Sequence, residues 1–486
     1  MIWMMKTMKN IELTKEQNEC VNYRAGDLLV KGVPGSGKSY IILKRALKIY
    51  KDNNGQSSIK IFTYTNALVR YTDELLQAKL GESAISVSTV DSYFRDLYRA
   101  MTRRSFYCND KKCREIVEKT LGEHARRSKK SHRFYNVDQD FWLEEFLWIQ
   151  EKCLLTEDDY IQTNRRGRGS QVKMMTEADK KKAWSIYQLF CQKMREVHCN
   201  TWPELYLYIN EHVSKIPESY KVDYVFVDEA QDMTLGKMRA LKAITKKAIT
   251  IAADMNQKIY KTSFTWKETG IDIQGRASKS LTRTFRSTKQ IVTLAEDLAK
   301  TNRKNDSLKD ELTEMVLPEA EGSLPRLFIF SSMLKEETYL CDLAKRLLEQ
   351  RMDKTIGVIC KTKKYYYRIR AQFNSKRIPY QEVFRDGKYI PDWRLLEPGI
   401  KLVVAKSSKG LEFDTVIIPD LDEGTYPFIP MRIDSDQVDE FIATERNLLY
   451  VAMTRARESL FMLCTSAHKS RFITELSEDH YERCVL

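Results

Sequence analysis

Long apolar runs are absent from this sequence, and their absence limits the kind of protein that it encodes. No stretch of about 18 apolar residues is available to cross a bilayer. Residues Met1 to Asn10 are apolar and basic, but they lack the extended apolar segment and the small-residue cleavage site of a signal peptide. We therefore expect a cytoplasmic protein that has no membrane partner.

Closely spaced cysteine pairs are absent as well. The 10 cysteines are scattered along the chain, as is typical of reduced thiols in a cytosolic protein. Zinc and iron–sulfur sites usually contain at least one C-x2-C pair, and this sequence has none. A metal cluster is therefore the less favoured interpretation of the five cysteines that fall within one region, which are Cys108, Cys113, Cys153, Cys191 and Cys199.

Basic residues outnumber acidic ones, with 81 Lys and Arg against 67 Asp and Glu, which gives a net charge of +14. Such an excess favours a polyanionic partner, because Lys and Arg displace the counterions that condense on phosphates. Two basic clusters lie at residues 126–130 and 165–168. These clusters are either a nucleic-acid surface or an ordinary solvated helix face, and the sequence leaves both interpretations open.

Short apolar runs occur in two series, and each run leads into a loop and then a helical pattern. Strands that alternate with helices are typical of parallel sheets with ligand sites at the strand ends. We therefore predict an α/β fold with two lobes, which suits a length of 486 residues. The first series is Leu28–Val30, Ile59–Tyr64, Tyr224–Val227 and Ile249–Ala252, and the second is Leu327–Phe330, Ile356–Cys360, Leu402–Ala405, Val416–Ile418 and Leu460–Cys464.

A segment with a mostly helical pattern, rich in aromatic and basic residues, interrupts the first series. We interpret it as an insertion into the first lobe. The predicted domains are a first lobe of residues 1–93 and 220–280, a helical insertion of residues 94–219, and a second lobe of residues 281–486.

A glycine-rich loop follows the first predicted strand, with the sequence Gly32-Val33-Pro34-Gly35-Ser36-Gly37-Lys38-Ser39. It fits the pattern G-x-x-x-x-G-K-[ST], in which glycines let backbone N–H groups close around phosphates. Lys38 would reach the β- and γ-phosphates, and the Ser39 hydroxyl would bind Mg²⁺. The strand before the loop and the helical pattern after it favour a P-loop over a chance glycine turn.

Two carboxylates follow the predicted strand at residues 224–227. Asp228 would provide a second contact to Mg²⁺, and Glu229 would orient and polarise the attacking water. Carboxylates in such a position often only cap a helix, but a P-loop requires a partner of this kind. The two motifs together predict hydrolysis of a nucleoside triphosphate, without separating a motor from a small-molecule kinase.

The P-loop and the segment Asp228-Glu229-Ala230-Gln231-Asp232 resemble those of the UvrD/Rep/PcrA group of superfamily 1 helicases, and other motifs extend this resemblance along the whole chain. The resemblance implies two RecA-like P-loop lobes that bind ATP with Mg²⁺. It also implies that Leu13–Gln17 is the Q motif of this family, in which Gln17 reads the adenine edge.

Three further segments resemble family motifs that contact single-stranded DNA. By this resemblance, Tyr64, Asn66 and Ser92 touch the strand, and Tyr260 stacks on a base. Trp266 would replace a family tryptophan that follows at shorter spacing. The segments are Thr63–Asn66, Thr89–Tyr93 and Asp254–Tyr260.

The remaining nucleotide contacts of this family come mostly from the second lobe. The resemblance implies that Phe285 is a platform for adenine, Arg286 a clamp on the γ-phosphate, and Glu412 a residue near the ribose. Arg455 would be a second arginine finger, and Gln257 of the first lobe would sense the γ-phosphate. The matching second-lobe segments are Thr284–Ser287, Lys409–Phe413 and Glu445–Ala456.

The sequence departs from the family pattern at several places. Ala253 replaces a glycine, Val404 a threonine and Lys406 a histidine. Only Gln381 to Lys401 separates the segment that ends in I-P-Y from K-G-L-E-F, where full-size relatives carry a large subdomain. Unwinding by this chain alone is therefore left open.

The sequence as a whole predicts an ATP-dependent DNA helicase or translocase on single-stranded DNA, and the resemblance implies 3′ to 5′ movement. The alternative is a DNA-stimulated ATPase that acts as a regulatory or sensing subunit of a separate nuclease, for example in a phage-defence system. A third hypothesis is a regulatory ATP-dependent clamp with little turnover, which the presence of Glu229, Arg286 and Arg455 disfavours.

Overall fold

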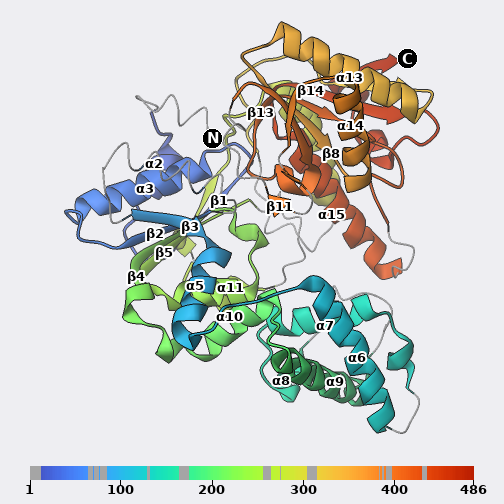
Figure 1. The fold of residues 1–486 in the computed structure, drawn as a ribbon. Coiled ribbons are helices and arrows are strands. Elements are labelled where there is room, and N and C mark those ends of the chain that lie inside the picture. Colours follow the sequence, from blue (N-terminus) through green and yellow to red (C-terminus); the bar gives the residue numbers. More distant parts are fainter. Residues whose placement is uncertain are drawn as a thin grey trace.

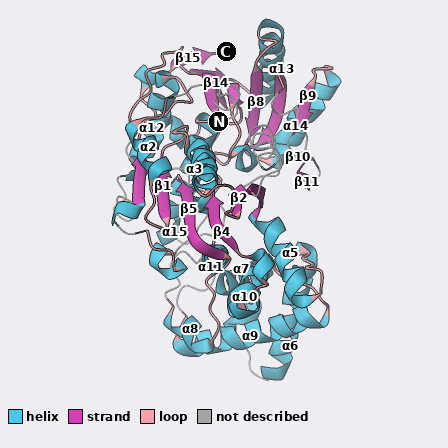
Figure 2. Ribbon diagram, turned by 90° about the vertical axis from the view of Figure 1, so that its left-hand side faces the viewer, coloured by secondary structure: helices cyan, strands magenta, loops and turns pink. Residues whose placement is uncertain are grey.

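Two large parallel β-sheets, each covered by helices, and a separate helical bundle make up most of the described part of the molecule (Figure 1). A short antiparallel pair, β10 (Phe384–Arg385) and β11 (Lys388–Tyr389), forms a further sheet. The computed structural model describes residues 12–63, 69, 76, 85–128, 132–163, 175–254, 264–273, 275–303, 315–382, 384–385, 388–389, 397–429 and 435–486. Figure 2 shows the bundle at one end, the first sheet in the middle and the second sheet at the other end. The predicted α/β class with two parallel-sheet lobes and a helical insertion is confirmed.

The first sheet contains six parallel strands in the order β3-β2-β4-β5-β1-β6. Its central strands are mostly buried, because helices cover both faces of a parallel sheet. The carboxyl ends of β1 and β4 lie at the same edge, so the glycine-rich loop and the acidic pair come together there. The strands are β1 (Leu28–Gly32), β2 (Ile59–Thr63), β3 (Ile85–Thr89), β4 (Val222–Val227), β5 (Thr245–Ala253) and β6 (Ser278–Leu281).

Two apolar cores lie on the two faces of this sheet. Alternation along β4 sends Val225 and Val227 into one core and Phe226 into the other. Apolar side chains of α3 fill the second of these cores, while α5, α10 and α11 fill the first. The helices of this lobe are α2 (Lys15–Asn22), α3 (Lys38–Asp52), α5 (Val90–Thr102), α10 (Trp202–Glu211) and α11 (Leu235–Ala243).

The helical bundle has an apolar core of its own, which is rich in aromatic residues. The residues of this core belong to the segment from Cys113 to Cys199. By contrast, Phe94 of α5 and Leu205 of α10 are buried in the core of the first lobe. The separate bundle is therefore shorter than the segment 94–219 that interrupts the first lobe. Its helices are α6 (Asp110–Ser128), α7 (Gln139–Glu151), α8 (Glu157–Gln162) and α9 (Glu177–Glu196).

The second sheet contains seven parallel strands in the order β15-β7-β14-β13-β8-β12-β9. Helices α12 and α15 pack on one face, and α13 and α14 pack on the other. The strands are β7 (Arg326–Phe330), β8 (Thr355–Cys360), β9 (Tyr380–Glu382), β12 (Gly399–Val404), β13 (Phe413–Ile418), β14 (Ala456–Thr465) and β15 (Glu482–Val485). The helices are α12 (Lys289–Arg303), α13 (Met333–Gln350), α14 (Lys363–Ser375) and α15 (Ser435–Met453).

Among the described residues, no helix has the length and apolar character needed to cross a membrane. All 10 cysteines are free thiols. Within the described part of the chain, no three His, Cys, Asp or Glu side chains are arranged to hold a metal ion.

Candidate nucleotide-binding site between the two lobes

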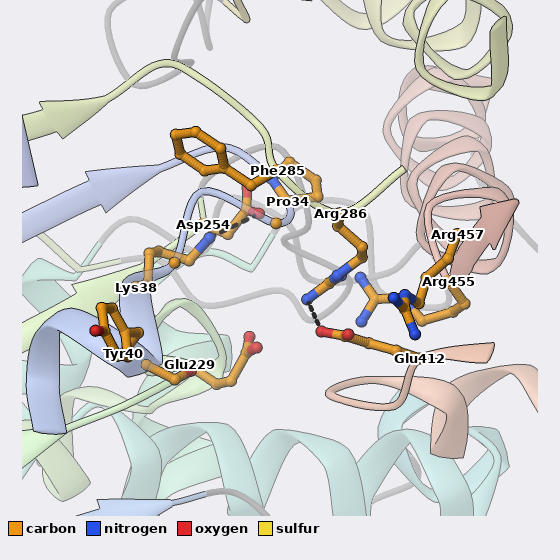
Figure 3. A pocket seen from close by; sticks show the side chains of 13 residues that line it. Pro34, Lys38, Tyr40, Glu229, Asp254, Phe285, Arg286, Glu412, Arg455 and Arg457 are labelled. Carbon is orange, nitrogen blue, oxygen red and sulfur yellow. Dashed lines mark hydrogen bonds and ion pairs between the residues drawn. The ribbon is translucent and has the colours of Figure 1, made fainter. Parts of the chain in front are cut away.

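One pocket lies between the two lobes, at the carboxyl edge of the first sheet. Figure 3 shows the carboxylate of Glu229 on one side of this pocket and three arginines on the other side. Both lobes contribute to the wall of the pocket, so any molecule bound there contacts both. The lining residues are Pro34, Gly35, Gly37, Lys38, Ser39, Tyr40, Glu229, Asp254, Phe285, Arg286, Glu412, Arg455 and Arg457.

The glycine-rich loop has the backbone that its sequence predicts. Gly35 and Gly37 adopt left-handed φ values of 73° and 84°, which side chains disfavour. A Cβ atom on Gly35 would lie 2.5 Å from the Cβ of Arg286, and one on Gly32 would lie 2.5 Å from the Oγ of Ser36. The loop thus needs glycine both for its conformation and for its close contact with the second-lobe motif.

Lys38 begins α3, and its ammonium group is fully engaged by the protein. It donates to the carbonyl oxygens of Gly32 at 2.8 Å and Val33 at 2.9 Å. It also pairs with the carboxylate of Asp254 at 3.2 Å. An ammonium group has three donor hydrogens, so phosphate oxygens can bind Lys38 only by replacing some of these partners.

Gln17 of α2 is hydrogen-bonded to the glycine-rich loop. Its side-chain amide donates to the carbonyl oxygen of Ser36 at 3.1 Å and accepts from the backbone N–H of Thr14 at 3.1 Å. Gln17 is buried and does not belong to the pocket wall given above. In this structure Gln17 therefore fastens the N-terminal segment to the P-loop.

Ser39 lines the pocket, and its hydroxyl donates to the carboxylate of Asp228, which is buried behind it. Burial, reinforced by the charge of Glu229, raises the pKa of Asp228. A hydroxyl and a carboxylate are the oxygen donors that Mg²⁺ prefers. The donor set therefore fits the predicted Mg²⁺ site.

Glu229 follows β4 and adopts a left-handed φ of 55°. Burial alone would raise the pKa of its carboxyl group. The positive charges of Lys409, Lys38 and Arg455 outweigh that effect, so the pKa lies below its usual value. Glu229 is therefore an ionised carboxylate near the P-loop, as a base that polarises water must be.

Gln231 joins Glu229 to the end of β5. Its side-chain N–H donates to the Glu229 carboxylate at 2.6 Å, and its carbonyl oxygen accepts from the backbone N–H of Asp254 at 2.9 Å. Both Gln231 and Asp254 are buried. A continuous set of contacts therefore runs from Glu229 through Gln231 and the backbone and side chain of Asp254 to Lys38.

The segment after β6 is attached to both lobes. The backbone N–H of Phe285 donates to the carbonyl oxygen of Gly35 in the P-loop at 3.0 Å. The Ser287 hydroxyl donates to the carbonyl oxygen of Ala456 in the second lobe at 2.6 Å. Arg286 lies between these two attachments, so its position depends on both lobes.

Arg286 forms an ion pair with Glu412 at 2.7 Å, which Figure 3 marks with a dashed line. Burial alone would raise the pKa of Glu412, but the nearby guanidinium of Arg286 holds it below its usual value. The Nε and Nη1 atoms of Arg286 are buried and have no hydrogen-bond partner among the described residues. Unsatisfied buried donors are costly, and an anionic ligand in the pocket would satisfy them.

Arg455 is anchored by its own lobe. Its guanidinium donates to the carbonyl oxygens of Val451 at 2.9 Å and Leu411 at 3.3 Å. Burial and the charge of Arg286 together lower its pKa to about 10, so it stays positive at neutral pH. Arg457, two residues further on, pairs with Asp414 at 2.9 Å and also lines the pocket.

The structure brings most of the predicted nucleotide residues together, but the predicted DNA residues are only partly described. Four predicted residues, Tyr64, Asn66, Gln257 and Tyr260, lie outside the described residues. Ser92 lies in the first turn of α5, with its N–H capped by the Thr89 hydroxyl. Trp266 is half-buried against the core of the first lobe and contacts Phe264 edge to face.

The sequence did not single out Tyr40, Asp254 and Arg457 of the pocket wall. It also did not single out Gln231, which donates to Glu229. Gln231 and Asp254 stand inside segments that resemble family motifs, and this position was the signal that could have identified them. Arg457 follows Arg455 at a spacing of two, which places both at the start of β14. That spacing was the corresponding signal for Arg457.

Two parallel-sheet lobes, a P-loop and arginines that face it from the second lobe define a two-lobed P-loop nucleotide-binding protein. The sequence matches the UvrD/REP helicase N-terminal domain over residues 13–319 and the UvrD-like helicase C-terminal domain over residues 394–467. The chain therefore belongs to the UvrD/REP helicase family, as the motif resemblance implied.

Curated relatives support this assignment. The chain is 22% identical over 475 residues to a probable DNA helicase II homolog of Mycoplasma capricolum, covering 90% of this chain and 61% of that protein. It is 24% identical over 289 residues to a probable DNA helicase of Mycoplasma pneumoniae, covering 54% and 48%. A shorter match, 29% over 106 residues, is to a Lactobacillus johnsonii protein named as one subunit of an ATP-dependent helicase/nuclease, covering 18% and 9%. The chain thus spans less than two thirds of each relative.

Proposed function

We propose that this chain is an ATP-dependent DNA helicase or translocase that moves 3′ to 5′ along single-stranded DNA. The observation that carries the proposal is the pocket itself, in which a P-loop and an ionised glutamate face arginines of the other lobe. Membership of the UvrD/REP helicase family supports it. Relatives named as DNA helicases support it further.

The chain's own residues have distinct tasks in ATP hydrolysis. Lys38 exchanges its present partners for phosphate oxygens, and Glu229 orients the attacking water and accepts its proton. Ser39 and Asp228 hold Mg²⁺, which when bound neutralises phosphate charge. Arg286 and Arg455 stabilise the charge that develops on the γ-phosphate in the transition state.

Hydrolysis is coupled to movement because the catalytic groups belong to different lobes. The two arginines act only when the second lobe stands close to the P-loop, so ATP binding favours closure and product release favours opening. Aromatic side chains of one lobe would hold the bases, and each cycle of closure and opening would move the strand past these side chains. Tyr64 and Tyr260 are our candidates for this grip, with Asn66, Ser92 and Trp266 as further strand contacts, since stacking tolerates any base.

A second candidate function has its own supporting observation. Only residues 383–398 connect β9 to β12, so the second lobe carries no large subdomain at this point. One matching relative is named as part of a helicase/nuclease. Both facts favour a DNA-stimulated ATPase that drives or senses strands for a separate nuclease, with little unwinding of its own.

A tailed-duplex experiment separates these functions. The chain is mixed with ATP and Mg²⁺ and with a duplex that carries either a 3′ or a 5′ single-stranded tail, and the released strand is measured. Release from the 3′-tailed duplex supports the helicase proposal, and preference for the 5′ tail contradicts the polarity. ATP turnover with displacement of streptavidin from a biotinylated strand, but without release of the duplex strand, supports the second candidate function, a DNA-stimulated ATPase that moves along a strand without unwinding.

A further inference from the structure

We propose that Cys108 and Cys113 form a redox-sensitive pair, in which Cys108 reacts with a hydroperoxide and Cys113 then closes a disulfide bond with it. The inference concerns the joint between the first lobe and the helical bundle, and it does not depend on the proposed function. Cys108 precedes α6, and Cys113 lies near the start of this helix. Both are free thiols, as is Cys199, which follows α9.

Two segments connect the bundle to the first lobe, and they run side by side. The segment before α6 pairs with the segment after α9 where Cys108 lies opposite Asn200 in a parallel bridge. The backbone N–H of Asn200 also donates to the carbonyl oxygen of Tyr107 at 2.7 Å. A covalent change at Cys108 therefore acts on the connection between the first lobe and the bundle.

Three thiols meet at this joint. Cys113 and Cys199 are 3% and 1% exposed and belong to the core of the bundle, whereas Cys108 is only partly buried. The S–H of Cys113 donates to the sulfur of Cys108, and Cys113 also contacts Cys199. The three are not arranged to hold a metal ion. Cys113 is therefore the direct partner of Cys108, and Cys199 lies behind it.

The surroundings of Cys108 favour its thiolate form. Its sulfur accepts from the S–H of Cys113 and from the backbone N–H of Trp202, the first residue of α10. These hydrogen bonds outweigh burial and hold the pKa of Cys108 below its usual value, whereas the bond to Cys108 and burial raise the pKa of Cys113. A partly exposed thiolate beside a second, resolving thiol is the arrangement that redox-sensing cysteines have.

The chemistry consists of two steps. The Cys108 thiolate attacks one oxygen of hydrogen peroxide, so that an S–O bond forms, the O–O bond breaks and hydroxide leaves. The sulfur is oxidised in this step and the peroxide is reduced. The Cys113 thiol then attacks the sulfur of the sulfenic acid, an S–S bond replaces the S–O bond, and the thiol proton leaves with the hydroxyl group as water.

Peptide mapping of the reduced, full-length chain tests the pair. The chain is treated with a slight excess of hydrogen peroxide, the remaining thiols are alkylated with iodoacetamide, and the protein is cut with trypsin. Trypsin cleaves after Lys111 and Lys112, between the two cysteines, so a disulfide between Cys108 and Cys113 joins two peptides that otherwise separate. We expect this linked pair to form before any other disulfide, and dithiothreitol to release it.

Cys153 is the matched control, because it is also a partly buried free thiol but burial raises its pKa. At neutral pH we expect iodoacetamide to alkylate Cys108 at least about tenfold faster than Cys153, since the thiolate is the reactive form. In C113S, peroxide should leave Cys108 as a sulfenic acid that dimedone traps. The wild type and C153S should both form the disulfide and take up little dimedone.

Two results on the wild-type chain would overturn the inference, whether or not C113S folds. One is a first disulfide that joins Cys113 to Cys199 and leaves Cys108 as a thiol. The other is alkylation of Cys153 as fast as that of Cys108. Equal labelling of folded C113S and of the wild type by dimedone would likewise exclude Cys113 as the thiol that resolves the sulfenic acid.

Discussion

At the scale of single residues, the pocket shows why the amino-acid type at each position matters. Lys38 and Arg286 form ion pairs with Asp254 and Glu412. The pKa of Glu229 lies below its usual value, because the positive charges around it outweigh the effect of its burial. These groups line the pocket and lie outside the apolar cores. Removal of one of them should therefore change the rate of ATP hydrolysis far more than the stability of the fold.

Glu229→Gln tests the role of the carboxylate that would activate water. We expect kcat for ATP to fall by roughly 10²–10⁴-fold, because a neutral amide cannot accept the proton. Binding of a non-hydrolysable ATP analogue should stay within a few-fold of the wild type. Steady-state hydrolysis and fluorescence binding measure the two effects. A kcat close to that of the wild type would exclude Glu229 as the base.

Gly35→Ala tests the close contact between the P-loop and the second-lobe motif. The new Cβ would meet the Cβ of Arg286 at 2.5 Å, so we expect ATP affinity to fall at least about tenfold as the loop shifts. Gly270→Ala is the matched control, because Gly270 has the same φ of 73° and nothing within 4 Å of the added atom. It shares the backbone strain without the clash. Equal affinities for the two variants, measured by titration, would contradict this explanation.

At the scale of elements, the strands that form the centres of the sheets were predictable and the edge strands were not. The apolar runs that become β1, β4 and β14 are buried on both sides, so their composition identifies them. Strands β6 and β15, in contrast, lie at sheet edges and are largely polar. Their place depends on tertiary pairing with β1 and β7, which no local pattern records.

The candidate site was predicted to a similar extent. The P-loop and the acidic pair follow strands directly, and contiguous motifs identify them. The bond from Gln231 to Asp254 and the pair of Arg286 with Glu412 join residues that are distant in sequence. Such pairings depend on how strand ends meet in space. The limits of the helical bundle could not be predicted for the same reason. The apolar pattern of α5 does not indicate whether this helix packs in the core of the first lobe or in the core of the bundle.

The start of α13 yields a prediction about pH. Burial raises the pKa of Glu336 from 4.5 to about 7, although the N–H of Asp420 and the O–H of Tyr365 donate to its carboxyl group. Burial likewise raises the pKa of Asp420 from 3.8 to about 7. Between about pH 4 and 7 the folded chain therefore binds more protons than the unfolded chain, so these groups make stability fall as pH rises.

Glu336→Gln isolates this effect, because Gln cannot ionise. Melting temperatures of the wild type and E336Q are measured from pH 5.5 to pH 8. We expect the variant to gain stability relative to the wild type as pH rises through this window. A difference between the two proteins that does not change with pH would show that the Glu336 carboxyl is ionised in the folded chain throughout this window, and it would contradict the raised pKa.

At the scale of the whole molecule, residues 285–287 are central, because they connect the P-loop to the strand that begins beside Arg455. One hydrogen bond from Phe285 reaches the first lobe, and one from Ser287 reaches the second. Movement between the lobes must therefore change the surroundings of Arg286. This arrangement supports the proposed coupling between closure of the lobes and hydrolysis, and the net charge of +14 suits a polyanionic strand.

The most direct test of this account is steady-state ATP hydrolysis with and without single-stranded DNA, with Lys38→Ala as the inactive control. We expect strong stimulation by DNA and a loss of at least about 100-fold in the control, since Lys38 is the P-loop cation for the phosphates. Hydrolysis that does not respond to single-stranded DNA, or that survives in the control, would contradict the proposal that this pocket drives movement along a strand.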